Sequence, residues 1–277
     1  MSLVSRAERE RVTVMSDIVL VERHGGAAVI TLNLPERRNV LSADLVHAIG
    51  AAFDAVEADE TVKCIVLTGA GKAFCAGAEL PVLRAASEGK FDSVREVYDG
   101  FLRVLRSPLP VIAAVNGPAV GAGFNLALAC KVRLAGKRAS FDTRFAQLRL
   151  HPGRGHVWLL ARAVGEQQAI LATVFGEVWS AERAKEAGLV ASVHEDETLL
   201  ADAVALARKL DGQDQAFVRR LMSTVELARV TSTHTKALEQ ETSAQEWSTK
   251  QPAFATGLAA IEARITAGKR PPSPSRS

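Results

Sequence analysis

Strand-like and helix-like segments alternate over residues 17–197, and this alternation limits the possible folds more than any other feature of the chain. Short runs rich in Val, Ile and Leu predict strands, because they are brief, apolar and β-branched. They lie at 18–22, 27–33, 63–69, 111–117, 131–135 and 189–193. Helical spacing of apolar residues marks 42–58, 92–107 and 121–130. This order predicts an α/β fold with a mostly parallel sheet covered by helices.

The remaining segments predict the domain organisation. Residues 198–267 are almost entirely helical in pattern, so we expect a C-terminal helical region after the 17–197 core. Residues 1–16 predict a flexible tail, and the Pro- and Ser-rich residues 268–277 predict a disordered one. The core is expected to hold the ligand site, because ligands of open α/β folds bind where strands end and helices begin.

Composition argues against several classes of function. The 277 residues are 48% hydrophobic with a formal net charge of +3, which gives no reason to expect nucleic-acid binding. Cys64, Cys75 and Cys130 lie far apart without a C-x-x-C pair, which predicts reduced thiols and no metal site. The chain shows no secretory signal and no apolar run of membrane-spanning length, so we expect a cytoplasmic protein.

Two stretches of very small residues follow predicted strands, GAGKAFCAGAEL at 69–80 and NGPAVGAGFNLALAC at 116–130. Small side chains let a ligand approach the backbone, and the start of a helix leaves N–H groups without partners. Two such donors from different loops would stabilise a negative oxygen, although the same residues also suit close helix–strand packing. A P-loop is excluded because Ala73 follows Gly71-Lys72, and a dinucleotide fingerprint fails at Leu126.

Together these two stretches resemble the enoyl-CoA hydratase/isomerase (crotonase) family. The resemblance extends over about residues 17–267 and includes NLPERRNVLS, HPGRG and WSAERAKEAGLVASV in the same order. It implies a crotonase-like ββα superhelix with a C-terminal helical region that forms trimers, or hexamers made of two trimers. It also implies an acyl-CoA thioester as substrate or ligand, with no tightly bound cofactor and no metal.

The resemblance places an oxyanion hole on the backbone N–H groups of Ala76 and Ala122. Alanine at position 122, where the family commonly has glycine, keeps the N–H. The CoA and thioester path is implied to run along Gly77, Ala78 and Glu79, with basic contacts from Arg37, Arg38 and Arg264. For each arginine, an ordinary solvated charge is the competing interpretation.

The sequence departs from the family at the two positions where hydratases commonly carry glutamates. These positions hold Asn125 and Phe145. Asparagine orients a water but exchanges no proton at neutral pH, and phenylalanine does neither. The departure therefore predicts poor hydratase activity.

Residues 141–156 contain possible substitutes for the missing acids, among which Asp142 and His151 stand out beside Arg144 and His156. For His151, packing or capping near Pro152 is the competing interpretation. Three functions stay open: a hydratase or isomerase of fatty-acid or related acyl-CoA metabolism, other thioester or carbonyl chemistry with a relocated base, and a non-catalytic acyl-CoA-binding protein.

Overall fold

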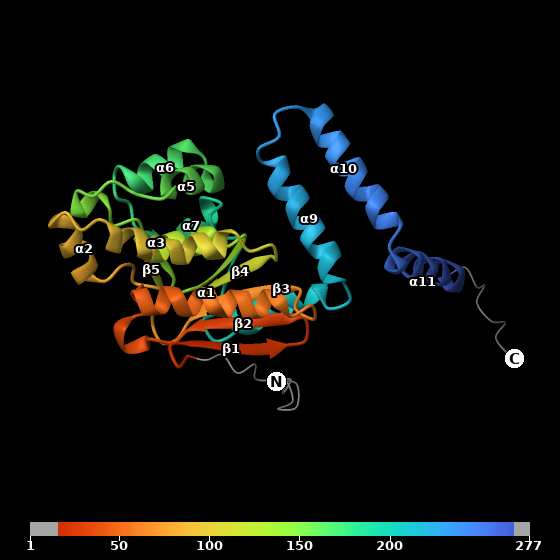
Figure 1. Ribbon diagram of the computed structural model, residues 1–277, viewed down its shortest axis with the longest axis horizontal. Helices are drawn as coiled ribbons and strands as arrows, with labels where there is room; N and C mark the ends of the chain where they lie inside the picture. Colours follow the sequence, from red (N-terminus) through yellow and green to blue (C-terminus); the bar gives the residue numbers. More distant parts are fainter. Residues whose placement is uncertain (1–15, 269–277) are drawn as a thin grey trace, which may run out of the picture. The chain divides into compact units, whose positions relative to one another are not determined.

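The computed structural model describes residues 16–268, and the predicted tails at 1–15 and 269–277 lie outside the described residues. The chain divides into two compact units that meet between Gln215 and Ala216. Figure 1 shows the elements of both units, which are described separately below.

The larger unit is built on a six-stranded sheet of order β1-β2-β3-β4-β6-β9. Its strands are β1 Val19–His24, β2 Ala27–Leu32, β3 Cys64–Gly69, β4 Val111–Val115, β6 Val132–Gly136 and β9 Ser192–His194. Only the hairpin pair β1 and β2 is antiparallel among these described strands, whereas every later pair is parallel. Three short strands form a second sheet of order β5-β7-β8, with β5 Pro118–Val120, β7 Ser140–Asp142 and β8 Trp179–Ser180.

Helices connect these strands. They are α1 Ala43–Ala58, α2 Leu80–Ser87, α3 Asp92–Leu105, α4 Ala122–Ala129, α5 His156–Val164, α6 Glu166–Thr173, α7 Ala181–Glu186 and α8 Leu199–Ala207. Short 3-10 turns occur at Pro35–Arg37, Ala146–Leu148 and Arg208–Leu210. The Ser42 hydroxyl caps α1 by accepting from the Leu45 N–H at 3.2 Å.

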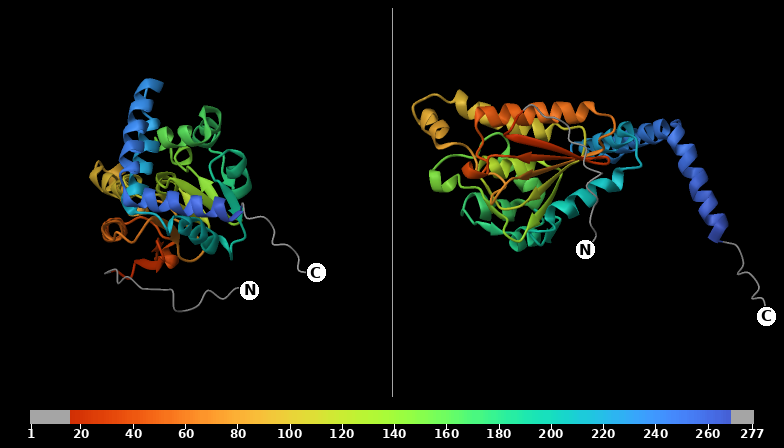
Figure 2. Two further views of the ribbon diagram at one scale, coloured as in Figure 1. Left: turned by 90° about the vertical axis from the view of Figure 1, so that its right-hand side faces the viewer. Right: turned by 90° about the horizontal axis from the view of Figure 1, so that it is seen from below.

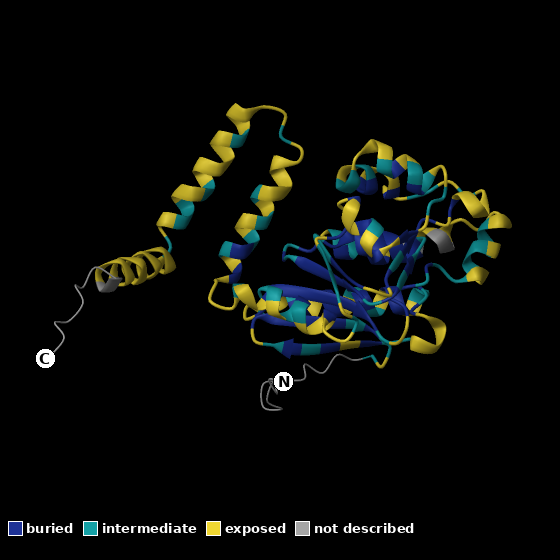
Figure 3. Ribbon diagram, turned by 180° about the vertical axis from the view of Figure 1, so that it is seen from behind, coloured by how far each residue is buried: buried dark blue, intermediate teal, exposed yellow. Residues whose placement is uncertain are grey.

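Alternation along the strands divides the core between two faces of the main sheet. One face packs against α1, α3 and α4, and contains Ala28, Ile30, Leu32, Ile65, Leu67, Val111 and Ala113. The other packs against α8, and contains Ala27, Val29, Cys64, Val66, Ile112 and Ala114. Successive strand residues point to opposite faces, so these runs are apolar on both sides. Figure 2 shows the sheet from two further sides, and Figure 3 shows its central strands coloured mostly as buried.

The predicted strands and long helices are found within a few residues of their expected positions. The boundary before the helical region differs, because α8 lies within the larger unit and buries Leu199, Ala203 and Ala207 against the sheet. The short β5, β7 and β8 and the helices α2, α5, α6 and α7 went unpredicted. Their segments are too short, or too mixed in composition, for periodicity to distinguish them.

The described residues of the smaller unit form helices joined by short turns, without a strand. It contains α10 His234–Thr249, α11 Pro252–Gly268 and α9 Gln215–Ala228, whose first residue still belongs to the larger unit. Within the described residues, no helix of either unit is long and apolar enough to cross a membrane.

Candidate functional site

The two small-residue stretches lie side by side where β3 and β4 end. A parallel bridge pairs Cys75 with Ala119. The Cys75 N–H donates to the Pro118 carbonyl at 3.2 Å, and the Val120 N–H donates to the Cys75 carbonyl at 3.0 Å. The prediction that residues distant in sequence converge at strand ends is therefore confirmed for this pair of loops.

Two buried or half-buried asparagines fix the course of the first loop. Asn39 Nδ2 donates to the carbonyl oxygens of Ala70 and Ala73, at 3.0 and 2.9 Å, while its Oδ1 accepts from the Leu34 N–H at 2.9 Å. Asn116 accepts from the Gly69 N–H at 3.2 Å and donates to the Gly71 carbonyl at 3.1 Å. These side chains replace the backbone partners that an irregular loop lacks, which holds the loop in one conformation.

Gly77 allows the closest approach between the loops. Its φ of +97° suits glycine, and a Cβ there would lie 2.7 Å from the Val120 carbonyl oxygen and 3.7 Å from the Ala122 nitrogen. Ala78 and Ala122 each lie three residues beyond the bridged pair of Cys75 and Ala119. The approach of Gly77 to Val120 and Ala122 brings the first loop against the start of α4.

The N–H groups of these alanines differ from that of Ala76. The Ala76 N–H donates to the Arg38 carbonyl at 3.0 Å. In the described part of the chain, no backbone acceptor bonds the N–H of Ala78, or that of Ala122 at the first position of α4. The first intrahelical bond of α4 runs from Asn125 to Gly121, so the helix start leaves donors exposed to a ligand. The Ala76 N–H, the expected first donor, is thus bonded within the chain, whereas the Ala78 N–H has no such backbone acceptor.

Asn125 lies on α4 and faces a buried histidine at the start of α5. Asn125 Oδ1 and His156 Nδ1 form a hydrogen bond, and the two side chains are 0% and 1% exposed. The Phe145 ring meets the His156 ring edge-on at 5.1 Å between centroids, and the Phe124 ring does so at 5.5 Å. Asn125 and Phe145, the two positions at which the sequence was expected to depart from the family, therefore contact one imidazole.

Burial among these aromatic rings determines the charge of His156. It lowers the pKa of the imidazole from 6.5 to about 4, because the charged form loses its hydration. The ring is consequently neutral at pH 7, with one nitrogen carrying hydrogen and the other able to accept a hydrogen bond.

Comparison with known proteins identifies the fold and the family. The profile of the enoyl-CoA hydratase/isomerase family matches residues 22–267. The chain belongs to this family. The probable enoyl-CoA hydratase EchA14 of Mycobacterium tuberculosis is 42% identical over 253 residues, which cover 89% of this chain and 97% of that protein. The 1,2-epoxyphenylacetyl-CoA isomerase of Escherichia coli is 39% identical over 206 residues, 72% of this chain and 78% of that one.

Solved structures agree with this assignment. The enoyl-CoA hydratase of Bacillus anthracis superposes with a TM-score of 0.83 at 30% identity, covering 89% of this chain and 96% of its own. The predicted crotonase membership and α/β fold class, with a helical C-terminal region, are confirmed.

Asp142 and His151, the two side chains predicted to substitute for the missing acids, lie in different surroundings from His156. The Asp142 carboxylate is buried and accepts from the Arg144 N–H at 2.7 Å and from its Nε at 2.8 Å. His151 is exposed, and its Nδ1 lies 2.7 Å from the Pro152 carbonyl oxygen. Asp142 is thus committed to a local ion pair, and His151 stands outside the buried cluster.

The predicted basic contacts also separate. Arg37 forms an ion pair with Glu79, so these two residues of the expected CoA path neutralise one another. Arg38 is exposed with a left-handed φ of +51°, and its carbonyl accepts from Ala76. Arg264 lies on α11 in the smaller unit and is exposed.

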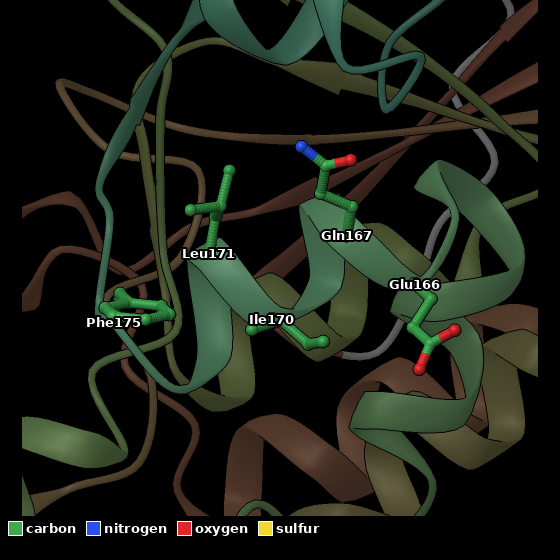
Figure 4. A pocket seen from close by; sticks show the side chains of 5 residues that line it. All are labelled: Glu166, Gln167, Ile170, Leu171 and Phe175. Carbon is green, nitrogen blue, oxygen red and sulfur yellow. The ribbon is translucent and has the colours of Figure 1, made fainter.

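Hollows elsewhere in the larger unit contain none of the loop alanines. One of about 320 Å³ lies along α6 and is lined by Glu166, Gln167, Ile170, Leu171 and Phe175 (Figure 4). Another of about 590 Å³ is lined partly by His151, Val157 and Val174. Neither lining includes Ala78 or Ala122, so neither hollow places a charged group beside these two residues.

Sequence reasoning missed two features of the site. It did not show that the Arg38 carbonyl accepts from the Ala76 N–H, because spacing alone does not reveal a contact from another segment. It gave His156 less weight than His151, although His156 lies at the helix start directly after HPGRG. The spacing of His156 from Leu159 and Leu160, which puts these three residues on the inward face of one helix, was the available signal.

Proposed function

We propose that this protein binds an acyl-CoA thioester and stabilises its enolate oxygen with the backbone N–H groups of Ala78 and Ala122. The pair of donors without backbone acceptors, on two adjacent loops, carries the proposal. Donors aimed at developing negative charge are worth much more inside a protein than in water, because they need no reorganisation during the reaction.

The start of α4 adds to this site. Helix macrodipoles carry partial positive charge at their N-termini, and Ala122 is the first residue of α4. The Gly77, Ala78 and Glu79 backbone forms one wall of the thioester path, and Arg37 and Arg38 supply positive charge near its rim. A CoA phosphate competes with Glu79 for Arg37 in this arrangement.

The reaction belongs to the enoyl-CoA hydratase/isomerase type in this proposal. Relatives named as a probable hydratase and as a CoA-thioester isomerase support chemistry on CoA thioesters. Because Asn125 and Phe145 cannot transfer protons, catalysis needs a relocated base, and His156 is the titratable group that contacts both positions. A non-catalytic acyl-CoA-binding protein is the second candidate, favoured by the same two substitutions.

The cellular setting follows the family in this proposal. We place the protein in the cytoplasm, in fatty-acid or related acyl-CoA metabolism, as a homotrimer or a hexamer of two trimers. The helical smaller unit would mediate this assembly, and Arg264 would contact the CoA of a neighbouring subunit.

Two variants at one position test the proposal. Ala122→Pro removes the N–H at a helix position that tolerates proline, whereas Ala122→Gly keeps it. We expect Ala122→Pro to lower kcat for 2-enoyl-CoA turnover by roughly 100- to 1,000-fold. Ala122→Gly should lose far less. Similar losses in both variants would contradict a role for the N–H, and absence of acyl-CoA binding by the wild-type protein in calorimetry would contradict the proposal entirely.

A further inference from the structure

Three side chains at the outer edge of the main sheet form a hydrogen-bonded chain. The Ser192 hydroxyl lies 2.6 Å from Nε2 of His194, and Nδ1 of His194 lies 2.8 Å from Oδ2 of Asp202. Ser192 and His194 lie on β9, and Asp202 lies on α8. A hydroxyl, an imidazole and a carboxylate joined in this order form the arrangement that activates a serine as a nucleophile.

Asp202 determines which nitrogen of the imidazole carries the hydrogen. An ionised carboxylate only accepts hydrogen bonds, so Nδ1 of His194 must donate to it. The Thr198 hydroxyl also donates to Asp202 Oδ2, at 2.9 Å, which helps to hold the carboxylate in place. When the imidazole is neutral, Nε2 is then the acceptor, and the Ser192 hydroxyl donates to it. The hydroxyl proton therefore already points at a base.

The local structure explains why these side chains meet and why they are accessible. Residues two apart in a strand point to the same face of a sheet, and Ser192 and His194 have this spacing. The packing of α8 on the sheet, with Leu199 and Ala203 buried, brings Asp202 to the imidazole. Ser192 is half-buried, and the side chains of His194 and Asp202 are 21% and 44% exposed. A small reagent in solution therefore reaches the cluster without a deep pocket.

The strand that carries Ser192 also has a free edge. β9 is the last strand of the main sheet and pairs with β6 on one side, and no strand of residues 16–268 lies on its other side. The free edge of a strand presents backbone N–H groups. Such groups are donors for the oxygen of a carbonyl that a neighbouring nucleophile attacks. None of the residues of this cluster belongs to the two loops of the candidate thioester site.

We propose that Ser192 is an activated nucleophile, with His194 as its general base and Asp202 as the residue that positions the imidazole. Its substrates are small activated acyl esters, because the hydroxyl lies at an accessible strand edge and not in a deep pocket. The activity is independent of the proposed acyl-CoA function, since it uses a different set of residues.

The reaction consumes one ester and one water. Ser192 Oγ bonds to the carbonyl carbon while its proton passes to His194 Nε2, and this proton leaves with the alcohol as the ester C–O bond breaks. Water then attacks the acyl-serine and gives a proton to Nε2, the acid is released, and the proton returns to Ser192 Oγ. The products are one acid and one alcohol, and both side chains return to their starting states.

A fluorophosphonate probe tests the nucleophile directly, because its phosphorus bonds to an activated serine oxygen with loss of fluoride. Peptide mapping by mass spectrometry should place the probe on Ser192 of the wild-type protein. His194→Gln should slow this labelling by about 100-fold, the smaller end of what a positioned general base contributes. Ser248 is the internal control, because it is also half-buried but donates its hydroxyl hydrogen to the Gln245 carbonyl at 2.7 Å. It should stay unlabelled.

Hydrolysis of para-nitrophenyl acetate measures turnover. Wild-type protein should hydrolyse this ester faster than buffer does, and Ser192→Ala should lose the whole of that excess, whereas Ser248→Ala should keep it. Asp202→Asn should lower kcat and leave KM unchanged, because the carboxylate stabilises the imidazolium and does not touch the ester.

A cluster that only joins β9 to α8 gives different results. Wild-type protein without probe on Ser192 would overturn the proposal, and so would equal labelling rates in wild-type protein and a folded His194→Gln variant. Ester hydrolysis that persists in Ser192→Ala would place the activity elsewhere and would also overturn it. If His194→Gln fails to fold, Asp202→Asn, which keeps the shape of the side chain, takes its place in the labelling assay. An unchanged labelling rate in that variant would contradict the proposed role of the carboxylate.

Discussion

The two loops that form the site are stabilised in different ways. The first, around Ala76 to Glu79, is held by backbone and asparagine hydrogen bonds and is partly exposed at its rim. The second leads into α4, whose residues from Ala122 to Ala129 are all buried. Side-chain packing around Asn125 and His156 dominates there. The first loop thus presents its backbone, and the second adds a buried polar pair behind its backbone donor.

This difference would allow the residues at positions 125 and 145 to vary while the proposed oxyanion hole stays intact. The proposed hole depends on the course of the backbone, which Asn39, Asn116 and Gly77 fix. The proton-transfer groups depend on side chains, which vary without moving the backbone. We therefore expect three kinds of change to have different effects: changes at the contact between the loops alter stability, changes at His156 alter its pH dependence, and changes of surface charge have little effect.

The largest expected effect breaks the contact between the loops. A Cβ on Gly123 would overlap the Cys75 carbonyl oxygen and lie 2.7 Å from its carbonyl carbon. Backbone does not yield as a side chain does, so Gly123→Ala should lower the free energy of unfolding by about 3 kcal/mol or more. Urea denaturation measures this. Gly50→Ala is the matched control, because nothing lies within 4 Å of its added Cβ on α1, and a comparable loss there would contradict the explanation.

The pH dependence of stability should distinguish the second loop from the first, because His156 packs against Asn125 of α4. The folded-state pKa of His156 is lowered from 6.5 to about 4, so its contribution to stability is present above pH 6.5 and is lost as pH falls towards 4. Wild-type protein should lose up to about 3 kcal/mol more than His156→Phe over this range. Denaturant titrations of both proteins at several pH values measure the difference. Parallel pH profiles would show that the imidazole is not buried in its neutral form.

The smallest expected effect concerns the first loop. Arg37 and Glu79 form an ion pair whose arginine side chain is 55% exposed. Exposed pairs contribute little, so Glu79→Gln should change the free energy of unfolding by less than about 1 kcal/mol. The same denaturation assay checks this. A loss above about 2 kcal/mol would mean that the first loop also depends on side chains, which would remove the contrast between the loops.

The sequence predicted the main strands, the long helices and the convergence of the two loops, because apolar periodicity and small-residue runs are local signals. It did not distinguish Ala78 from Ala76, because that choice depends on the Arg38 carbonyl, which approaches from a different segment. The His156 contact with Asn125 spans 31 positions in sequence and depends on how α4 and α5 pack. Long-range contacts of this kind leave no periodic trace in the sequence.

The most direct test of the central claim is the carbonyl stretching frequency of a bound acyl-CoA, measured by infrared difference spectroscopy with carbon-13 at the thioester carbonyl. Two backbone donors polarise the carbonyl, so its frequency should fall below the value in water when the thioester binds wild-type protein. The shift should be largely lost in Ala122→Pro. An unshifted band in the wild-type complex, or an equal shift in Ala122→Pro, would contradict an oxyanion hole formed by Ala78 and Ala122.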